Sequence, residues 1–292
     1  MDMISGIRQR AAQGDAPSAG PSGERPLLAE ELARQFSLKG RTAVVTGAGG
    51  GIGRQAALTF TQAGADVVVA DVKADGLAET EAMVQALGGT ATVVPTDVTD
   101  RAQVNALAVA AIKANGRLDV WANVAGIIRN TMIVDATPDD VEAVTRVNQW
   151  GTYWGIAAAG RAMRNGGSII NVSSAGGEMP APTLSIYAMT KAAVNHLTRC
   201  AAVELGPSDI RVNAVAPGFT DTPMVQRNWT RDDGTVDEEA RQQLLDLRAA
   251  QSPLRTTATP EDQTWAMLYL ASDASRFVTG QVLRPNGGVV MA

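Results

Sequence analysis

Short apolar segments alternate along most of the chain with segments in which apolar residues recur at helical spacing. The predicted strands cover residues 42–46, 66–70, 91–95, 118–122, 167–172, 210–215 and a last stretch near 281–284. The predicted helices cover residues 51–63, 74–86, 101–115, 138–164, 186–205 and 260–272. Buried strands that alternate with helices predict an α/β fold with a parallel sheet covered on both faces. Ligands of such sheets bind at the carboxyl ends of the strands, so the residues after each strand are the first candidates for function.

The first 35 residues lack this pattern. Residues 13–26 are rich in Ala, Gly, Ser and Pro, which bury too little apolar surface to offset the entropy lost on ordering. We therefore predict a flexible N-terminal extension over residues 1–35, with a short helix near 27–36, and one domain over residues 36–292. The extension lacks the apolar core of a signal peptide, and no later stretch predicts a membrane span, so a cytoplasmic protein without a membrane partner is expected.

Composition narrows the classes of function further. The chain has 292 residues and 45% hydrophobic content, enough for the core of one α/β domain. Its net charge of −5 argues against nucleic acid or an anionic membrane as partner. His196 is the only histidine and Cys200 the only cysteine, which excludes a disulfide framework and a zinc site built from several such residues. Both are interpreted as helix-packing residues, and no metal is expected.

A glycine-rich turn, residues 46–53, joins the first predicted strand to the first helix of the domain. Unpaired N–H groups at the start of a helix attract anions, and glycines let a pyrophosphate approach the backbone. Gly47, Gly51, Ile52 and Gly53 are therefore candidate cofactor-binding residues. The strict G-x-G-x-x-G pattern is met only with Ala56 in the last place, so a tight turn that binds nothing is the alternative.

Asp71 ends the second predicted strand, about 20 residues beyond Gly51, where such folds place the carboxylate that accepts hydrogen bonds from a ribose. Its charge would repel a 2′-phosphate, so Asp71 favours NAD over NADP. The alternative role for Asp71 is to open the next turn or cap the following helix. Arg54 and Lys73 are the nearby cations that would reverse the preference.

Tyr187 has a lysine, Lys191, four residues further on in a predicted helix, so the two side chains share one face. An unperturbed tyrosine has a pKa near 10, and a cation about 4 Å away at an effective dielectric of about 20 would lower it by about three units. This predicts that Tyr187 is a general acid/base. Tyr-x-x-x-Lys also occurs by chance, and a surface pair is the alternative.

Five motifs occur together in this chain: Thr46-Gly47-x-x-x-Gly51-x-Gly53, Asn123-x-Ala125-Gly126, Ser174, Tyr187-x-x-x-Lys191 and Pro217-Gly218. In order and spacing they resemble the short-chain dehydrogenase/reductase superfamily, over about residues 36–292. The resemblance implies a single-domain Rossmann fold, a doubly wound parallel seven-stranded sheet with helices on both faces. It also implies an enzyme, usually a tetramer, that transfers a hydride between a nicotinamide cofactor and a secondary alcohol or ketone.

The resemblance assigns roles residue by residue. Tyr187 would be the acid/base and Ser174 would hydrogen-bond the substrate oxygen, with Ser173 as the competing serine. Lys191 would hold the cofactor's ribose and lower the pKa of the tyrosine, and Asn148 would hold a water of a proton relay. The further cofactor contacts that it implies are Asp97, Val98, Asn123, Ala125, Pro217, Thr220 and Thr222. Asn123 has an alternative role as a brace between central strands, and Val124 departs from the family motif.

Residues 222–258 form a long insertion with a charged predicted helix at 237–248, which we interpret as a lid over the substrate. We predict that the substrate pocket is mostly apolar and that the substrate is a hydrophobic small molecule. The residues expected to line the pocket are Met179, Pro180, Leu184, Met224 and Trp229. The main alternative is an NADPH-dependent enzyme similar to 3-oxoacyl-carrier-protein reductases. Remoter alternatives are a non-catalytic dinucleotide-binding regulator and an isomerase, epimerase or dehydratase of the same fold.

The predicted helices over residues 138–164 and 186–205 carry apolar or small residues on more than one face. In the helix over residues 138–164 the largest of these residues are Trp150, Tyr153 and Trp154. A helix that is apolar on two sides needs two neighbours, one of them the sheet and the other a second subunit. A homo-oligomer, most simply a homotetramer, is therefore predicted.

Overall fold

A computed structural model describes residues 27–226, 228–231 and 233–291. Its backbone contacts divide the chain into residues 1–34 and residues 35–292. The short helix predicted near 27–36 is present as α2 (Leu27–Phe36). Most of the predicted flexible extension lies outside the described residues, so that interpretation stays a prediction.

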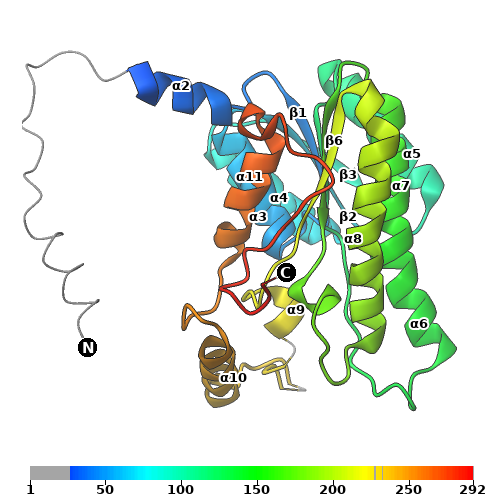
Figure 1. Ribbon diagram of the computed structural model, residues 1–292, viewed down its shortest axis with the longest axis vertical. Helices are drawn as coiled ribbons and strands as arrows, with labels where there is room; N and C mark the ends of the chain where they lie inside the picture. The colour runs from blue at the N-terminus through cyan, green and yellow to red at the C-terminus, as the bar shows by residue number, and fades with distance from the viewer. Residues whose placement is uncertain (1–26, 227, 232, 292) are drawn as a thin grey trace, which may run out of the picture. The chain divides into compact units, whose positions relative to one another are not determined.

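Seven parallel strands form one sheet in the order β3-β2-β1-β4-β5-β6-β7 (Figure 1). The strands are β1 (Thr42–Thr46), β2 (Asp66–Asp71), β3 (Ala91–Pro95), β4 (Val120–Asn123), β5 (Gly167–Val172), β6 (Ile210–Val215) and β7 (Val282–Leu283). The predicted parallel seven-stranded sheet is confirmed. Strand β4 begins two residues later than predicted, and β7 is only two residues long.

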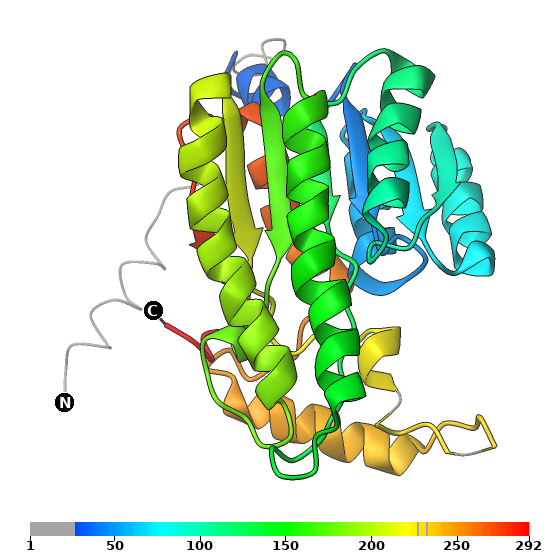
Figure 2. The same cartoon turned by 90° about the vertical axis from the view of Figure 1, so that its right-hand side faces the viewer.

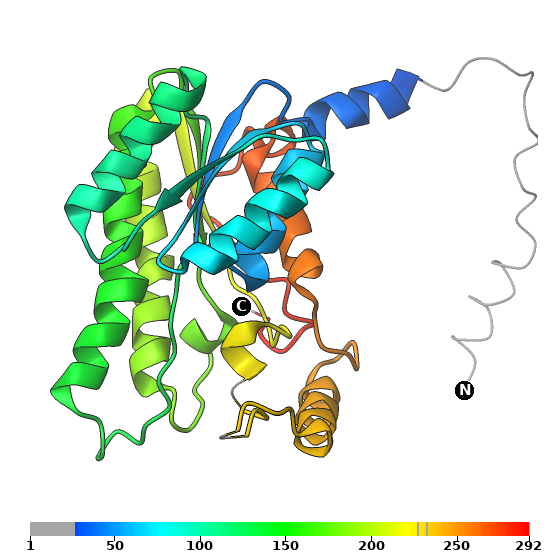
Figure 3. The same cartoon turned by 180° about the vertical axis from the view of Figure 1, so that it is seen from behind.

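Helices cover both faces of this sheet, as the opposite views of Figures 1 and 3 show. One face carries α3 (Gly51–Gln62), α4 (Ala74–Ala86) and α11 (Pro260–Ala271). The other carries α5 (Arg101–Asn115), α7 (Gly151–Ala162) and α8 (Ser185–Leu205), and faces the viewer in Figure 2. Alternate strand residues feed the two cores: Ala43 and Val45 join the first and Val44 the second.

The predicted helix over 138–164 is not continuous. It consists of α6 (Pro138–Thr145), a π-helical segment η1 (Arg146–Trp150) and α7. A capping box of Thr137 and Asp140 begins α6. Single-turn π segments are frequent at functional sites, and this one contains the fully buried Asn148.

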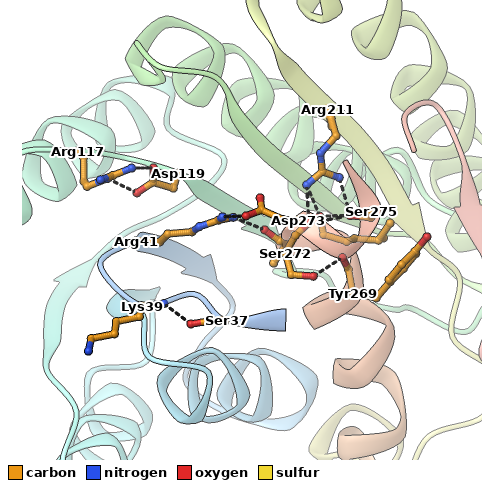
Figure 4. Close-up of polar contacts among 12 residues, drawn as sticks. Ser37, Lys39, Arg41, Arg117, Asp119, Arg211, Tyr269, Ser272, Asp273 and Ser275 are labelled. Atoms are coloured by element: carbon orange, nitrogen blue, oxygen red, sulfur yellow. Dashed lines mark hydrogen bonds and ion pairs between the residues drawn. The ribbon is translucent and has the colours of Figure 1, made fainter. Parts of the chain in front are cut away.

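Charged side chains fasten the amino end of the sheet (Figure 4). Arg41, just before β1, pairs with Asp273 at 2.6 Å, and Arg211 of β6 donates to the Ser275 hydroxyl at 2.8 Å. Asp119 accepts from Arg117 and from the Thr42 N–H at 2.9 Å. The glycine turn and the other candidate residues lie at the opposite end, beyond the carboxyl ends of the strands, which is where sheets of this kind bind ligands.

The remaining helices of the described residues are η2 (Ala175–Gly177), η3 (Gly206–Ser208), α9 (Pro223–Gln226), α10 (Glu238–Gln251) and η4 (Asp273–Ser275). In the described part of the chain, every helix is too short or too polar to cross a membrane.

Candidate active site

The glycine turn is held by backbone packing. A Cβ on Gly53 would overlap the Gly47 carbonyl oxygen, and one on Gly47 would lie 2.7 Å from the backbone of Ala125. Gly47 and Gly51 also have positive φ angles of 69° and 53°, which favour glycine. Gly50, at the N-cap of α3, has no side chain to occupy the first N–H groups. The turn therefore presents bare backbone donors at the carboxyl end of β1.

Asp71 lies against this turn. Its Oδ2 accepts from the Gly49 N–H at 3.0 Å, and its Oδ1 accepts from the Lys73 N–H at 3.0 Å. The carboxylate thus both closes the local turn and stands beside the glycines, so the two roles considered for Asp71 coexist.

Arg54, considered as a cation that would reverse the cofactor preference, binds other groups. Its guanidinium donates to the Gly49 carbonyl at 2.8 Å and to the Thr80 hydroxyl at 3.0 Å. It also pairs with Glu79 at 2.6 Å. The guanidinium of Arg54 is therefore bound to groups of the protein, and Glu79 offsets its charge.

The residues assigned to the adenosine side differ in how they are held. Asp97 accepts from the Thr99 N–H at 2.8 Å, and Val98 packs against Gly151, where a Cβ would lie 2.8 Å from the valine. The Asn123 amide accepts from the Trp121 indole at 2.7 Å and donates to Asn171 at 2.9 Å. The side chain of Asn123 therefore braces β4 against β5, which favours its alternative role.

Ser174, Tyr187 and Lys191 converge beside the carboxyl end of β5. Ser174 caps η2 and accepts from the Gly176 N–H at 3.0 Å, and its hydroxyl hydrogen-bonds Tyr187. The Lys191 ammonium lies 5.6 Å from the centre of the Tyr187 ring and donates to the Val172 carbonyl at 2.8 Å. Ser173 is buried, and its hydroxyl donates to the Lys191 carbonyl at 3.0 Å, so the competing serine has a structural role.

Asn148 joins this group through backbone groups. Its Oδ1 accepts from the Ile127 N–H at 2.8 Å and its Nδ2 donates to the Ile127 carbonyl at 2.9 Å. A Cβ on Gly126 would lie 3.4 Å from the Asn148 Oδ1 and 3.5 Å from the Lys191 Nζ, so both residues border Gly126. The Asn148 amide and the Lys191 ammonium therefore both lie near the Cα of Gly126.

Burial sets the titration of the pair. It lowers the pKa of Lys191 from 10.5 to about 8, because the charged amine has lost its water. Burial also raises the pKa of Tyr187, although the hydrogen bond with Ser174 acts in the opposite direction. The lowering of the Tyr187 pKa expected from Lys191 is therefore not found. Desolvation outweighs the attraction of an ammonium that lies near the ring and binds a carbonyl.

The segment after β6 crosses this site. The Pro217 carbonyl accepts from the Ala175 N–H at 2.9 Å, next to Ser174. Thr222 is 3.4 Å from a Cβ position on Gly51, and Thr220 donates to the Gly218 carbonyl at 3.1 Å. Residues 217–222 thereby connect the catalytic candidates to the glycine turn.

Two ion pairs near the candidate residues were not predicted from the sequence. Asp221 accepts from Arg241 of α10 at 3.1 Å, and Glu178 binds Arg284. Trp229, predicted to line the pocket, is almost fully buried within the insertion. No motif signals these pairs, because their members lie far apart in the sequence.

Known proteins share both the sequence pattern and the fold. A family model described as enoyl-(acyl carrier protein) reductase matches residues 47–290. The 3-oxoacyl-(acyl-carrier-protein) reductase FabG of Thermotoga maritima is 36% identical over 87% of this chain and 99% of its own. The 7alpha-hydroxysteroid dehydrogenase of Escherichia coli is 34% identical over 87% of this chain and 95% of its own. A short-chain type dehydrogenase/reductase from Mycobacterium marinum superposes with a TM-score of 0.82 at 33% identity, covering 89% of this chain and all of that one.

The lowered pKa of Lys191 predicts a pH-dependent stability. Between pH 8 and 10.5 the unfolded chain holds a proton that the folded chain has released, so folding becomes more favourable as pH rises through this window. Relative to Lys191→Met, the unfolding free energy of the wild type should rise by about 2–3 kcal/mol between pH 7 and 10. Urea titrations at both pH values measure the difference. Lys113→Met, on the exposed side of α5, is the control, and parallel pH curves for wild type and Lys191→Met would contradict the shifted pKa.

Proposed function

The chain belongs to the short-chain dehydrogenase/reductase superfamily, a family of oxidoreductases, and we propose that it transfers a hydride between NAD(H) and a hydrophobic secondary alcohol or ketone. The observation that carries this proposal is the convergence of Ser174, Tyr187 and Lys191 beside the carboxyl end of β5, which residues 217–222 connect to the glycine turn. Asn148 borders the same lysine. All four residues of the proposed catalytic group are present, which argues against a regulator that has lost its chemistry.

Each residue has a defined task in this proposal. A bound nicotinamide would supply or accept the hydride. Tyr187 gives its proton to the substrate oxygen in reduction and takes it back in oxidation, while Ser174 donates a hydrogen bond to the same oxygen. The raised pKa of Tyr187 keeps the proton on the hydroxyl at neutral pH, which suits reduction. Lys191 holds the ribose hydroxyls, and Asn148 holds the water through which the proton is exchanged.

Preference for NAD rests on the charge beside the glycine turn. Asp71 stands against Gly49, and Arg54 is bound to Glu79. A ribose diol donates to such a carboxylate, whereas a 2′-phosphate is repelled by it. The proposed cofactor residues are the glycine turn with Ile52, then Asp71, Asp97, Val98, Ala125, Tyr187, Lys191, Pro217, Thr220 and Thr222, with Asn123 acting through its backbone.

The hydrophobic substrate and the lid are part of the same proposal. Met179 and Met224 are exposed apolar side chains on the segments after Ser174 and Thr222. Helix α10 of the insertion contacts the segment that contains Phe219 and Asp221. Arg241 pairs with Asp221, and the Arg248 guanidinium lies 5.6 Å from the centre of the Phe219 ring. These contacts support the proposal that residues 222–258 form a lid. An NADPH-dependent 3-oxoacyl-carrier-protein reductase remains the alternative, favoured by the relative from Thermotoga maritima.

A homotetramer is the proposed assembly. Val109 of α5 and Tyr153 of α7 are 66% and 51% exposed, on helices that pack against each other. A second subunit on this face would remove their apolar surface from water.

Replacement of the proposed acid/base tests the reaction. Tyr187→Phe should leave NADH binding nearly unchanged and lower kcat by about 10²–10⁴-fold, because only the proton donor is lost. Fluorescence titration measures binding, and NADH absorbance measures turnover in a screen of apolar secondary alcohols. Tyr153→Phe, an exposed tyrosine on α7, is the matched control. A Tyr187→Phe variant with more than a tenth of wild-type activity would refute the assignment.

Removal of the Asp71 carboxylate tests the cofactor preference. Asp71→Ala should reduce the ratio of NADH to NADPH affinity by about 10-fold or more, because repulsion of the 2′-phosphate disappears. Asp66→Ala, at the other end of β2, should leave the ratio unchanged. A wild-type preference for NADPH would bring the acyl-chain reductase to the front, and an unchanged ratio would show that other residues set the preference.

Charge on the exposed helix face tests the assembly. Sedimentation velocity at micromolar concentration should give a tetramer for the wild type and smaller species for the double variant Val109→Glu with Tyr153→Glu. Met83→Glu, on the exposed side of α4, should sediment as the wild type does. A monomeric wild-type protein would refute the proposal.

A further inference from the structure

Glu178 and Arg284 form an ion pair between two segments that border the candidate site. Both carboxylate oxygens take part: the Arg284 Nε donates to Oε2 at 2.8 Å, and its Nη2 donates to Oε1 at 2.8 Å. The two side chains are only 13% and 23% exposed, respectively. A two-point contact of this kind fixes direction as well as distance, unlike most surface ion pairs. We propose that Glu178 and Arg284 are positioning residues that hold the Ser174 hydroxyl against Tyr187. The inference rests on the proposed function.

Glu178 is connected to Ser174 through the short helix η2. The N–H groups of Glu178 and Met179 both donate to the Ala175 carbonyl at 3.0 Å, so the turn is closed immediately after the serine. The Asn195 amide donates to the Glu178 Oε1 at 3.4 Å and ties the turn to α8. A displacement of the Glu178 carboxylate is therefore transmitted to Ser174 through one compact turn.

The same turn lies directly on the helix that carries the catalytic tyrosine and lysine. A Cβ on Gly177 would be 2.8 Å from the Lys191 backbone, and one on Gly176 would be 3.4 Å from the Ser174 Oγ and 3.6 Å from the Tyr187 ring. Small shifts of η2 thus change the distance between the serine and tyrosine hydroxyls.

Arg284 stands on the opposite side, directly after the two-residue strand β7. The chain beyond it lies against residues 217–222, which carry proposed cofactor contacts. The Gly218 N–H donates to the Pro285 carbonyl at 3.3 Å, and a Cβ on Gly218 would lie 2.8 Å from Asn286. Backbone hydrogen bonds hold this edge beside β6 and the segment that follows it. Arg284 therefore stands on a fixed edge, and the ion pair ties the serine turn to that edge.

A double-mutant cycle tests whether the pair acts through Ser174. Glu178→Gln keeps the shape of the side chain but removes its charge, and should lower kcat about 10-fold while changing NADH affinity less than 3-fold. In a Ser174→Ala background the same substitution should change kcat less than 2-fold, because the hydroxyl that it displaces is already absent. Glu142→Gln, which removes the exposed pair of Glu142 with Arg146, is the matched control and should leave kcat unchanged.

The pH profile supplies a second measurement. The Ser174 hydrogen bond lowers the pKa of Tyr187, so its loosening should move the pH dependence of kcat for alcohol oxidation to higher pH in Glu178→Gln. Arg284→Lys keeps the positive charge but loses the two-point contact, and should shift the profile in the same direction. This second variant tests the geometry even where Glu178→Gln does not fold.

Two results would overturn the inference. A less stable Glu178→Gln protein with unchanged kcat and pH profile would show a purely structural pair. An equal loss of kcat in wild-type and Ser174→Ala backgrounds would show that the pair does not act through the serine. Failure of the proposed function itself is recognised separately, by full activity in Ser174→Ala and Tyr187→Phe.

Discussion

The close approach of backbone to backbone at the carboxyl end of β1 is the constraint on which the rest of the site depends. Gly53 lies against the Gly47 carbonyl and Gly47 against Ala125, so no side chain fits between α3, β1 and the end of β4. Thr46 completes the junction, because its hydroxyl donates to the Ala122 carbonyl and accepts from the Val124 N–H. This packing brings the glycine turn beside the central strands, within reach of the segments that follow β5 and β6.

Local patterns were enough to predict the scaffold. The strands β1, β3, β5 and β6 lie where the apolar segments predict them. Strand β1 is buried at every residue, as expected of a strand covered on both faces, whereas the edge strand β3 is only partly buried. The break in the helix over residues 138–164 was not predictable, since the residues around Asn148 keep helical spacing through the π segment. In this segment Asn148 binds the backbone of Ile127, a tertiary contact that no local pattern contains.

The candidate site was likewise only partly predictable from the sequence. Spacing alone places Tyr187 and Lys191 on one face of a helix, but it does not say which groups surround them once they are buried. Desolvation raises the pKa of Tyr187 and lowers the pKa of Lys191. The sequence argument, which considers only the attraction between the two charges, predicts a lowered pKa for Tyr187 and is therefore wrong in direction. The roles of Asn123 and Ser173 were likewise decided by partners, Asn171 and the Lys191 carbonyl, that the motifs do not contain.

The two ends of the sheet are fastened by different means, and this difference bears on function. At the amino end, Arg41, Arg117 and Arg211 pair with carboxylates or bind hydroxyl and carbonyl groups, with no need to leave room for a ligand. At the carboxyl end, where sheets of this kind bind their ligands, Glu178 with Arg284 and Asp221 with Arg241 join the segments that follow the strands. These ion pairs hold the segments that carry the candidate residues through contacts between side chains.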